Sequence, residues 1–242
     1  MHPLPALLAL AAFIAVHLLI GRMRFLRAIP RSRWLSAAGG VSVAYVFLQL
    51  LPELHQGQRV LAGASPVRAF AEHHAYLVAL AGLSAFYGLE RLAVSSRRHR
   101  GAQGTGTTST GVFWLHIGAF ASYNALVGYL LAQREDHGPR DLALYALAMA
   151  LHFVVADHGL REHHRDRYDR IGRWLLGAAA ALGWAAGLSM RVEEALLAVF
   201  VAFLSGGIVL NVLKEELPEE RESRFSAFLA GASAYALVIL MR

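Results

Sequence analysis

Eight apolar stretches, each close to 20 residues long, constrain this chain more than any other feature of its sequence. A helix needs about 20 mostly apolar residues to cross roughly 30 Å of hydrocarbon. Lipid offers no water to backbone groups, and the period-two alternation typical of barrel strands is absent, so helices are expected. The predicted helices cover residues 3–20, 34–52, 73–90, 111–132, 142–161, 174–190, 195–213 and 225–241.

The composition also indicates an all-α integral membrane protein, with one transmembrane domain over residues 1–242. Hydrophobic residues make up 56% of the chain and charged residues only 17%, whereas an average soluble domain has roughly 25% charged residues. This composition excludes a disordered or collagen-like chain. The chain has no cysteine, which excludes disulfide scaffolds, zinc ribbons, iron–sulfur clusters and thiolate catalysis.

The distribution of basic residues predicts the orientation in the membrane. The connections 21–33, 91–110, 162–173 and 214–224, together with Arg161, hold 17 of the 23 Lys and Arg residues. Such residues stay on the cytoplasmic side, so both termini are predicted to lie outside, and residues 97–110 form a flexible inner loop. Arginine outnumbers lysine 22 to 1, which favours a GC-rich bacterium and its inner (plasma) membrane.

The net charge of +6 is interpreted as this topology signal. Positive charge on inner loops accounts for it without a nucleic-acid partner, so none is expected. The predicted partner is the lipid bilayer itself.

Two of the predicted helices share a pattern. One reads GGVSVAYVFLQLLPEL over residues 39–54, and the other reads GGIVLNVLKEELPEE over residues 206–220. Both begin with a glycine pair and reach Leu-Pro-Glu, where proline is predicted to end the helix. The two helices cross in opposite directions. We therefore predict a 3+2+3 arrangement, in which helices 1–3 and 6–8 are inverted repeats, as in secondary transporters.

These two segments, with GLSAFYGLERL over residues 82–92, resemble the ZIP family of zinc and iron permeases. The eight helices, the outside termini and the variable loop after the third helix are similar as well. The resemblance implies a gradient-driven transporter or channel for divalent metal cations, rather than an enzyme, with the metal passing between helices four and five. Zinc is the expected substrate, followed by iron, manganese and nickel, and a homodimer is left open.

The family carries its metal ligands on helices four and five, in motifs close to H-N-x-P-E-G and H-x-x-P-H-E. In the segment LHFVVADHGL, His152 takes the place of the first histidine and Asp157 that of the final glutamate. On helix four, Asn124 takes the place of the glutamate. Gln49 stands where the family often has histidine and is predicted to line an outer vestibule. Other family ligands are replaced, which argues against a dinuclear site.

Helix geometry sorts the candidates into two levels, at a rise of 1.5 Å per residue. The upper level holds His152 with Asn124 and Tyr123, and the lower level holds His116 with Asp157 and His158. Imidazole and carboxylate suit Zn²⁺, Fe²⁺, Ni²⁺ and Mn²⁺, and a charge inside a span costs about 2.5–3.5 kcal/mol. The resemblance and these levels together give the predicted metal ligands, which are His152, Asp157, His116, Asn124, His158 and Gln49.

Two other polar residues receive structural interpretations, and two other functions remain open. His17 is expected to be structural, and Glu53 is expected at a solvated helix end. The first alternative function is a non-transporting member of the fold that acts as a sensor or scaffold. The second is an intramembrane metal-dependent enzyme, because His158-x4-His163-His164 resembles one histidine box of the membrane di-iron desaturases. That chemistry needs several boxes on one face.

Overall fold

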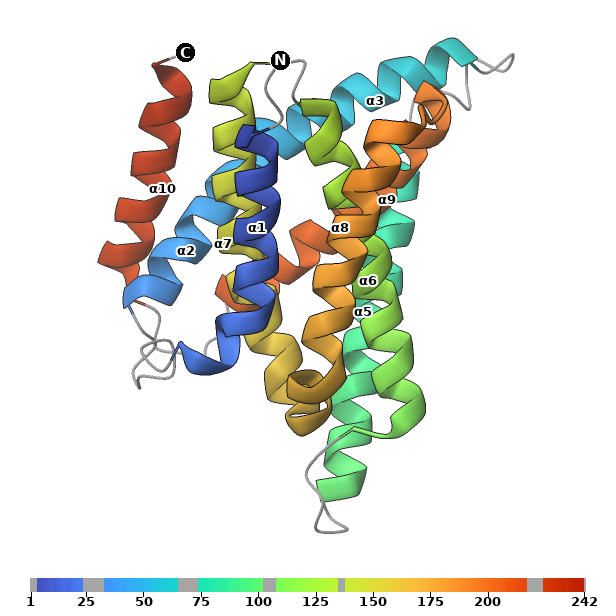
Figure 1. Ribbon diagram of the computed structural model, residues 1–242, viewed down its shortest axis with the longest axis vertical. Helices are drawn as coiled ribbons and strands as arrows, with labels where there is room; N and C mark the ends of the chain where they lie inside the picture. The colour runs from blue at the N-terminus through green and yellow to red at the C-terminus, as the bar shows by residue number, and fades with distance from the viewer. Residues whose placement is uncertain are drawn as a thin grey trace.

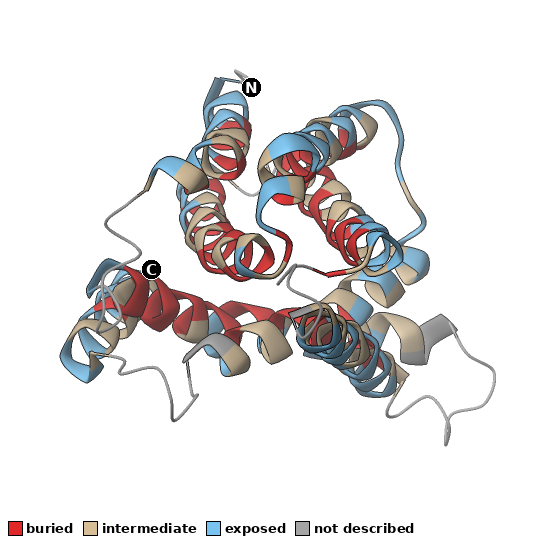
Figure 2. Cartoon of the chain, turned by 90° about the horizontal axis from the view of Figure 1, so that it is seen from below, coloured by how far each residue is buried: buried red, intermediate tan, exposed pale blue. Residues whose placement is uncertain are grey.

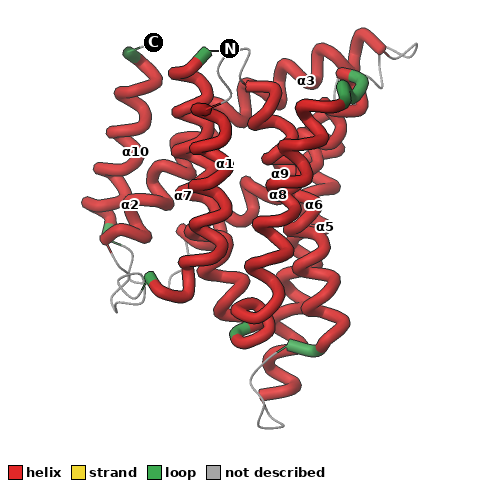
Figure 3. The backbone as a smooth tube through the Cα atoms, in the orientation of Figure 1, coloured by secondary structure: helices red, strands yellow, loops and turns green. Residues whose placement is uncertain are grey.

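The computed structural model describes residues 4–23, 33–64, 74–101, 108–134, 138–216 and 224–241, and its secondary structure in these ranges is helical (Figure 3). The start of the first helix and the end of the last lie at the same end of the bundle, which we call the terminal end (Figure 1). The α-helices are α1 (Leu4–Leu19), α2 (Arg33–Tyr45), α3 (Leu51–Ala64), α5 (His74–Gly101), α6 (Thr110–Gln133), α7 (Pro139–His164), α8 (Arg173–Ser189), α9 (Glu194–Glu216) and α10 (Phe225–Leu240). Three short segments are η1 (Ile20–Arg22) and the π-helical η3 (Val46–Leu50) and η5 (Tyr168–Gly172).

The described helices have the length and surface of membrane spans. Seven of them are long and apolar enough to cross a membrane, and the apolar α10 is shorter, with 16 residues. Large apolar side chains face outward, as at Leu182, which is 71% exposed. Trp34, Trp114 and Trp174 are exposed near the starts of α2, α6 and α8, where an interfacial aromatic belt would lie. The predicted all-helical class, with helices able to cross a membrane, is confirmed.

The prediction that Pro52 ends its helix is wrong. The helical run continues from α2 through η3 into α3, and the π-helical turn comes immediately before the proline. Proline lacks an N–H and its ring crowds the carbonyl one turn back, so a wider turn is a means of accommodating it. After this point α3 leaves the bundle at an angle at the terminal end (Figure 1). Pro218, the corresponding residue of the other segment, lies outside the described residues.

The third helix is also longer than predicted. α5 continues to Gly101, so residues 97–101 of the expected flexible loop are helical. Residues 102–107 lie outside the described ranges.

The helices divide into two groups by their packing. We call α1, α6, α7 and α8 the α1 group, and α2, α5, α9 and α10 the α2 group, with α3 lying against α5 and α9. The most extensive pairings are α6 with α8, α5 with α9 and α2 with α10, while α7 packs against α2 across the groups. Figure 2, seen along the bundle, shows that the buried residues gather on the facing sides of the helices.

Glycine allows the closest of these helix crossings. A Cβ atom on Gly128 of α6 would lie 2.1 Å from the carbonyl oxygen of Ala180, and one on Gly183 of α8 would lie 1.8 Å from that of Ala125. Small residues let helix backbones approach in lipid, where close packing drives association. The other two extensive pairings have matching glycines, Gly40 with Gly231 and Gly82 with Gly206.

The α6–α8 crossing gives a test with a matched control on one helix. Gly128→Ala should force the helices apart and lower the free energy of unfolding by about 1–3 kcal/mol, the usual effect of overpacking. Gly118→Ala places its Cβ in open space and should be neutral or raise stability by up to about 1 kcal/mol through helix propensity. Thermal unfolding of both variants in detergent measures the difference. Equal midpoints would contradict the role given to this crossing.

Candidate functional site

Three polar side chains from three helices of the α1 group meet inside the bundle, and we call them the central cluster. His17 of α1 lies between Asp157 of α7 and Asn124 of α6. Its Nδ1 is 2.7 Å from Asp157 Oδ2, and its Nε2 is 2.8 Å from Asn124 Oδ1. The three residues are at most 1% exposed. The cluster therefore joins three helices through buried hydrogen bonds.

The hydrogen bonds of the cluster determine how many protons it holds. Asn124 Nδ2 donates to the backbone oxygen of Phe120 at 2.8 Å, which turns Oδ1 toward His17 as an acceptor. His17 Nε2 must then carry a hydrogen and donate it. The remaining contact, Nδ1 to Asp157, needs one further proton between a basic nitrogen and a carboxylate. With that proton the His17–Asp157 pair is neutral overall, which lowers the cost of burying it.

Aromatic rings enclose the central cluster. The ring of Phe153 lies 4.8 Å from that of His17 and 5.2 Å from that of Phe13, measured between centroids. Tyr168 of η5 is fully buried nearby. Apolar surroundings strengthen the polar contacts inside them and make an unpaired polar group costly. This environment explains why Asp157 takes its partner from a helix 140 residues earlier in the chain.

His152 lies on α7, between the central cluster and the terminal end. Its ring is 5.7 Å from that of Tyr123 on α6, and the residue is 3% exposed. The Nδ1 atom is buried and has no hydrogen-bond partner within the described part of the chain. Most buried polar atoms in proteins are paired, so an unpaired imidazole nitrogen inside the bundle is a candidate ligand atom.

Three histidines gather near the end opposite the termini, and we call them the histidine cluster. His116 Nδ1 of α6 is 3.0 Å from His164 Nε2 of α7, and Thr108 Oγ1 lies 2.6 Å from His164 Nδ1. His163 Nε2 is 2.9 Å from Glu90 Oε1 of α5. A salt bridge of 3.0 Å joins the other carboxylate oxygen of Glu90 to Lys214 of α9. The histidine cluster therefore links helices of both groups.

An arginine organises the terminal end of α6 and α7. Arg134 donates to Asp141 at 2.9 Å and also pairs with Glu53 of α3. The sequence predicted Glu53 at a solvated helix end. In the structure it lies in the first turn of α3 in a partly exposed ion pair, with its side chain 28% exposed. Burial opposes the charge of Arg134, but Glu53 outweighs that effect and raises the pKa of the guanidinium above its ordinary value. Nearby, Gln49 accepts a hydrogen bond from Tyr235 of α10.

The structure brings together some of the predicted ligands and regroups the others. Asn124 and Asp157, predicted at different levels, share one histidine. That histidine is His17, for which the sequence predicted a structural role and indicated no partner. His116 hydrogen-bonds to His164 rather than joining Asp157 at a lower level. His158, predicted at the lower level, is half-buried on α7.

A polar residue in the apolar helix IAVHLLI was the available signal for His17, because ionisable groups inside spans are rare. The sequence alone does not name its partners. Within the described residues, no three His, Asp or Glu side chains lie close enough to share one metal ion. The central cluster offers two such side chains and an amide.

Comparison with protein-family models, with curated proteins and with solved structures found no match to this chain. The site is therefore interpreted from its own geometry.

A double-mutant cycle tests the pairing of His17 with Asp157. His17→Leu leaves a buried carboxylate without its partner, and Asp157→Leu leaves a buried imidazole nitrogen without its partner. Each unsatisfied group should lower the free energy of unfolding by about 1–3 kcal/mol. The double variant removes both groups, so its loss should be clearly smaller than the sum of the two single losses. Unfolding in detergent gives the coupling energy, and strictly additive losses would show that the contact is not energetically significant.

Proposed function

We propose that the chain is a gradient-driven transporter of divalent metal cations, similar in architecture to the ZIP permeases, with the cation moving along α6 and α7. The observation that carries this proposal is Asp157, an acidic side chain 1% exposed inside a helix long and apolar enough to span a membrane. An ionisable residue at such a position is a functional-site hypothesis by default, and its partner here is His17.

Polar groups occur at successive levels along the two central helices, which supports a route between them. Asn124 lies eight residues beyond His116 on α6, about 12 Å along the axis. From the terminal end, the Arg134–Asp141 ion pair comes first, then His152 with Tyr123 beside the central cluster, and then His116 with His164. A core built only for stability would not need titratable or amide groups at each level.

The donor types suit a transition-metal cation as substrate. Asp157 supplies carboxylate oxygen, Asn124 supplies amide oxygen, and His152 supplies an unpaired imidazole nitrogen. These ligands fit Zn²⁺, Fe²⁺, Mn²⁺ and Ni²⁺, with zinc the natural probe. Because the described residues hold no group of three His, Asp or Glu around one point, water would complete the coordination. A cation held by few protein ligands is also released readily, as transport requires.

The helix pairings support the proposed 3+2+3 arrangement. If the first three spans correspond to the last three, α2 corresponds to α9 and α10 to α5. The glycine crossing of α2 with α10 is then equivalent to that of α9 with α5. We further propose a bacterial inner membrane with the termini outside, because basic residues are concentrated in the connections at the opposite end.

A non-transporting sensor or scaffold is the second candidate. It is favoured because both ring nitrogens of His17 already contact protein groups, which leaves the central cluster satisfied without a cation. The unpaired Nδ1 of His152 favours transport instead. A measurement of metal-cation flux distinguishes the two functions, because only a transporter moves the cation across the membrane.

Zinc uptake by proteoliposomes, followed with an indicator inside the vesicles, tests the proposal. Asp157→Asn keeps the size of the side chain and a hydrogen-bond acceptor but removes the carboxylate. It should lower the initial rate at least about ten-fold, equal to about 1.4 kcal/mol of barrier. His152→Ala should also lower it, because the unpaired nitrogen is lost.

The matched control is Asp166→Asn, which neutralises an exposed aspartate and should leave uptake unchanged. Uptake by the unaltered protein no faster than in protein-free vesicles would favour the scaffold. Equal uptake by Asp157→Asn and the unaltered protein would show that the cation does not pass through the central cluster.

A further inference from the structure

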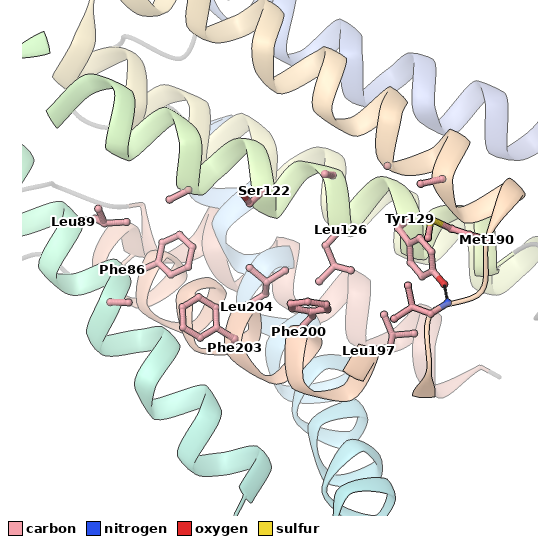
Figure 4. Close-up of a pocket in the computed structure, with 16 residues that line it drawn as sticks. Phe86, Leu89, Ser122, Leu126, Tyr129, Met190, Leu197, Phe200, Phe203 and Leu204 are labelled. Carbon is pink, nitrogen blue, oxygen red and sulfur yellow. Dashed lines mark hydrogen bonds between the residues drawn. The ribbon is translucent and has the colours of Figure 1, made fainter. Parts of the chain in front are cut away.

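A groove of about 560 Å³ runs between the two helix groups. Its walls come from α6 and α8 on one side and from α5 and α9 on the other, and Figure 4 shows Phe86, Phe200, Leu126 and Leu204 pointing into it. The volume is within the range of about 300–1,000 Å³ that is usual for ligand pockets. The groove shares no residue with the central cluster or the histidine cluster.

The groove offers a ligand an almost entirely apolar surface. Its two hydroxyl groups already have partners: Ser122 Oγ donates to Gly118 O at 3.0 Å, and Tyr129 OH accepts from the backbone N–H of Val192 at 2.9 Å. The other lining side chains are aliphatic, aromatic or thioether. A polar ligand would lose its water and could regain hydrogen bonds only at these two hydroxyl groups, so the lining favours an occupant that is apolar along this length.

A smaller polar pocket of about 230 Å³ adjoins the groove at the terminal end, and Met190 lines both. Arg191 stands at this pocket, where its Nη1 donates to Gln133 Oε1 at 2.8 Å. Gln133 in turn donates to the backbone oxygen of Gly187 at 3.0 Å. These contacts hold a guanidinium between the end of α8 and the start of α9, where the headgroups of a surrounding bilayer would lie.

We propose that the groove and the adjoining pocket together bind one membrane phospholipid, with an acyl chain in the groove and the phosphate beside Arg191. An apolar tail and an anionic group at the membrane surface are the two features that the site selects, and guanidinium matches phosphate geometry. A bilayer presents phospholipid at a far higher concentration than any other amphiphile, so mass action favours this occupant. The lipid fills the space between α6 and α9, whose side chains line the groove.

This inference requires that the chain spans a membrane, but it does not depend on cation transport. A protein that carries no zinc would still bind the lipid, and loss of the lipid site would leave Asp157 in place.

Native mass spectrometry of the full chain, released from vesicles of phosphatidylethanolamine and phosphatidylglycerol, tests the proposal. The unaltered protein should retain one phospholipid per chain. Ser122→Trp fills the groove from α6 and Ala85→Trp fills it from α5, and each should lower the lipid-bound fraction about ten-fold or more. Arg191→Gln should weaken retention several-fold.

Leu182→Trp, on an exposed face of α8 outside the groove, is the control and should retain the lipid. Two groove variants on opposite walls guard against one of them failing to fold. Equal retention by the groove variants and Leu182→Trp would overturn the proposal, as would an unaltered protein that retains no phospholipid. A dimer lost in both groove variants, with no lipid bound, would assign the groove to a second copy of the chain instead.

Discussion

A carboxyl group inside an apolar helix bundle needs a hydrogen-bond partner that it does not find on its own helix. Asp157 finds one on α1, at His17, and His17 in turn is held by Asn124 on α6. The shared proton keeps this group neutral, and surrounding aromatic rings keep it dry. Because each member is on a different helix, the cluster fixes how α1, α6 and α7 sit against one another, while α8 is held by the glycine crossing with α6. The geometry of the α1 group therefore depends on a polar contact as much as on its apolar packing.

Much of this fold was available in the sequence, because a membrane span is specified by a local property. Each of the eight apolar stretches overlaps a helix in the described part of the chain, with ends that agree within a few residues for α1, α6, α8 and α10. The helix after Pro52 was missed because proline was expected to end the helix. A π-helical turn before the proline instead lets the helix continue. The length of α5 was missed because its charged end extends beyond the apolar stretch on which the prediction was based.

Two of the three residues of the central cluster were among the predicted ligands, but their shared partner His17 was expected to be structural. Asp157 stood out because a charged side chain is rare inside a span, and Asn124 was selected because it takes the place of a glutamate in the resemblance to the ZIP family. His17 was assigned no partner because 140 residues separate it from Asp157, and only the packing of α1 between α7 and α8 brings the two together. The pairing of His116 with His164 was missed for the same reason. His116 is near the start of α6 and His164 is at the end of α7, and they become neighbours only because the two helices run antiparallel.

The proposed function requires that a hydrophilic cation can enter the space between α6 and α7. The chain has no cysteine, so one introduced at a chosen position reports access directly. His152→Cys should react with a small cationic thiol reagent in membrane vesicles, and Zn²⁺ should slow that reaction, whereas Leu147→Cys on the exposed face of α7 should stay unreactive because lipid excludes the reagent. A cysteine at position 152 that reacts no faster than the one at position 147 would contradict the account.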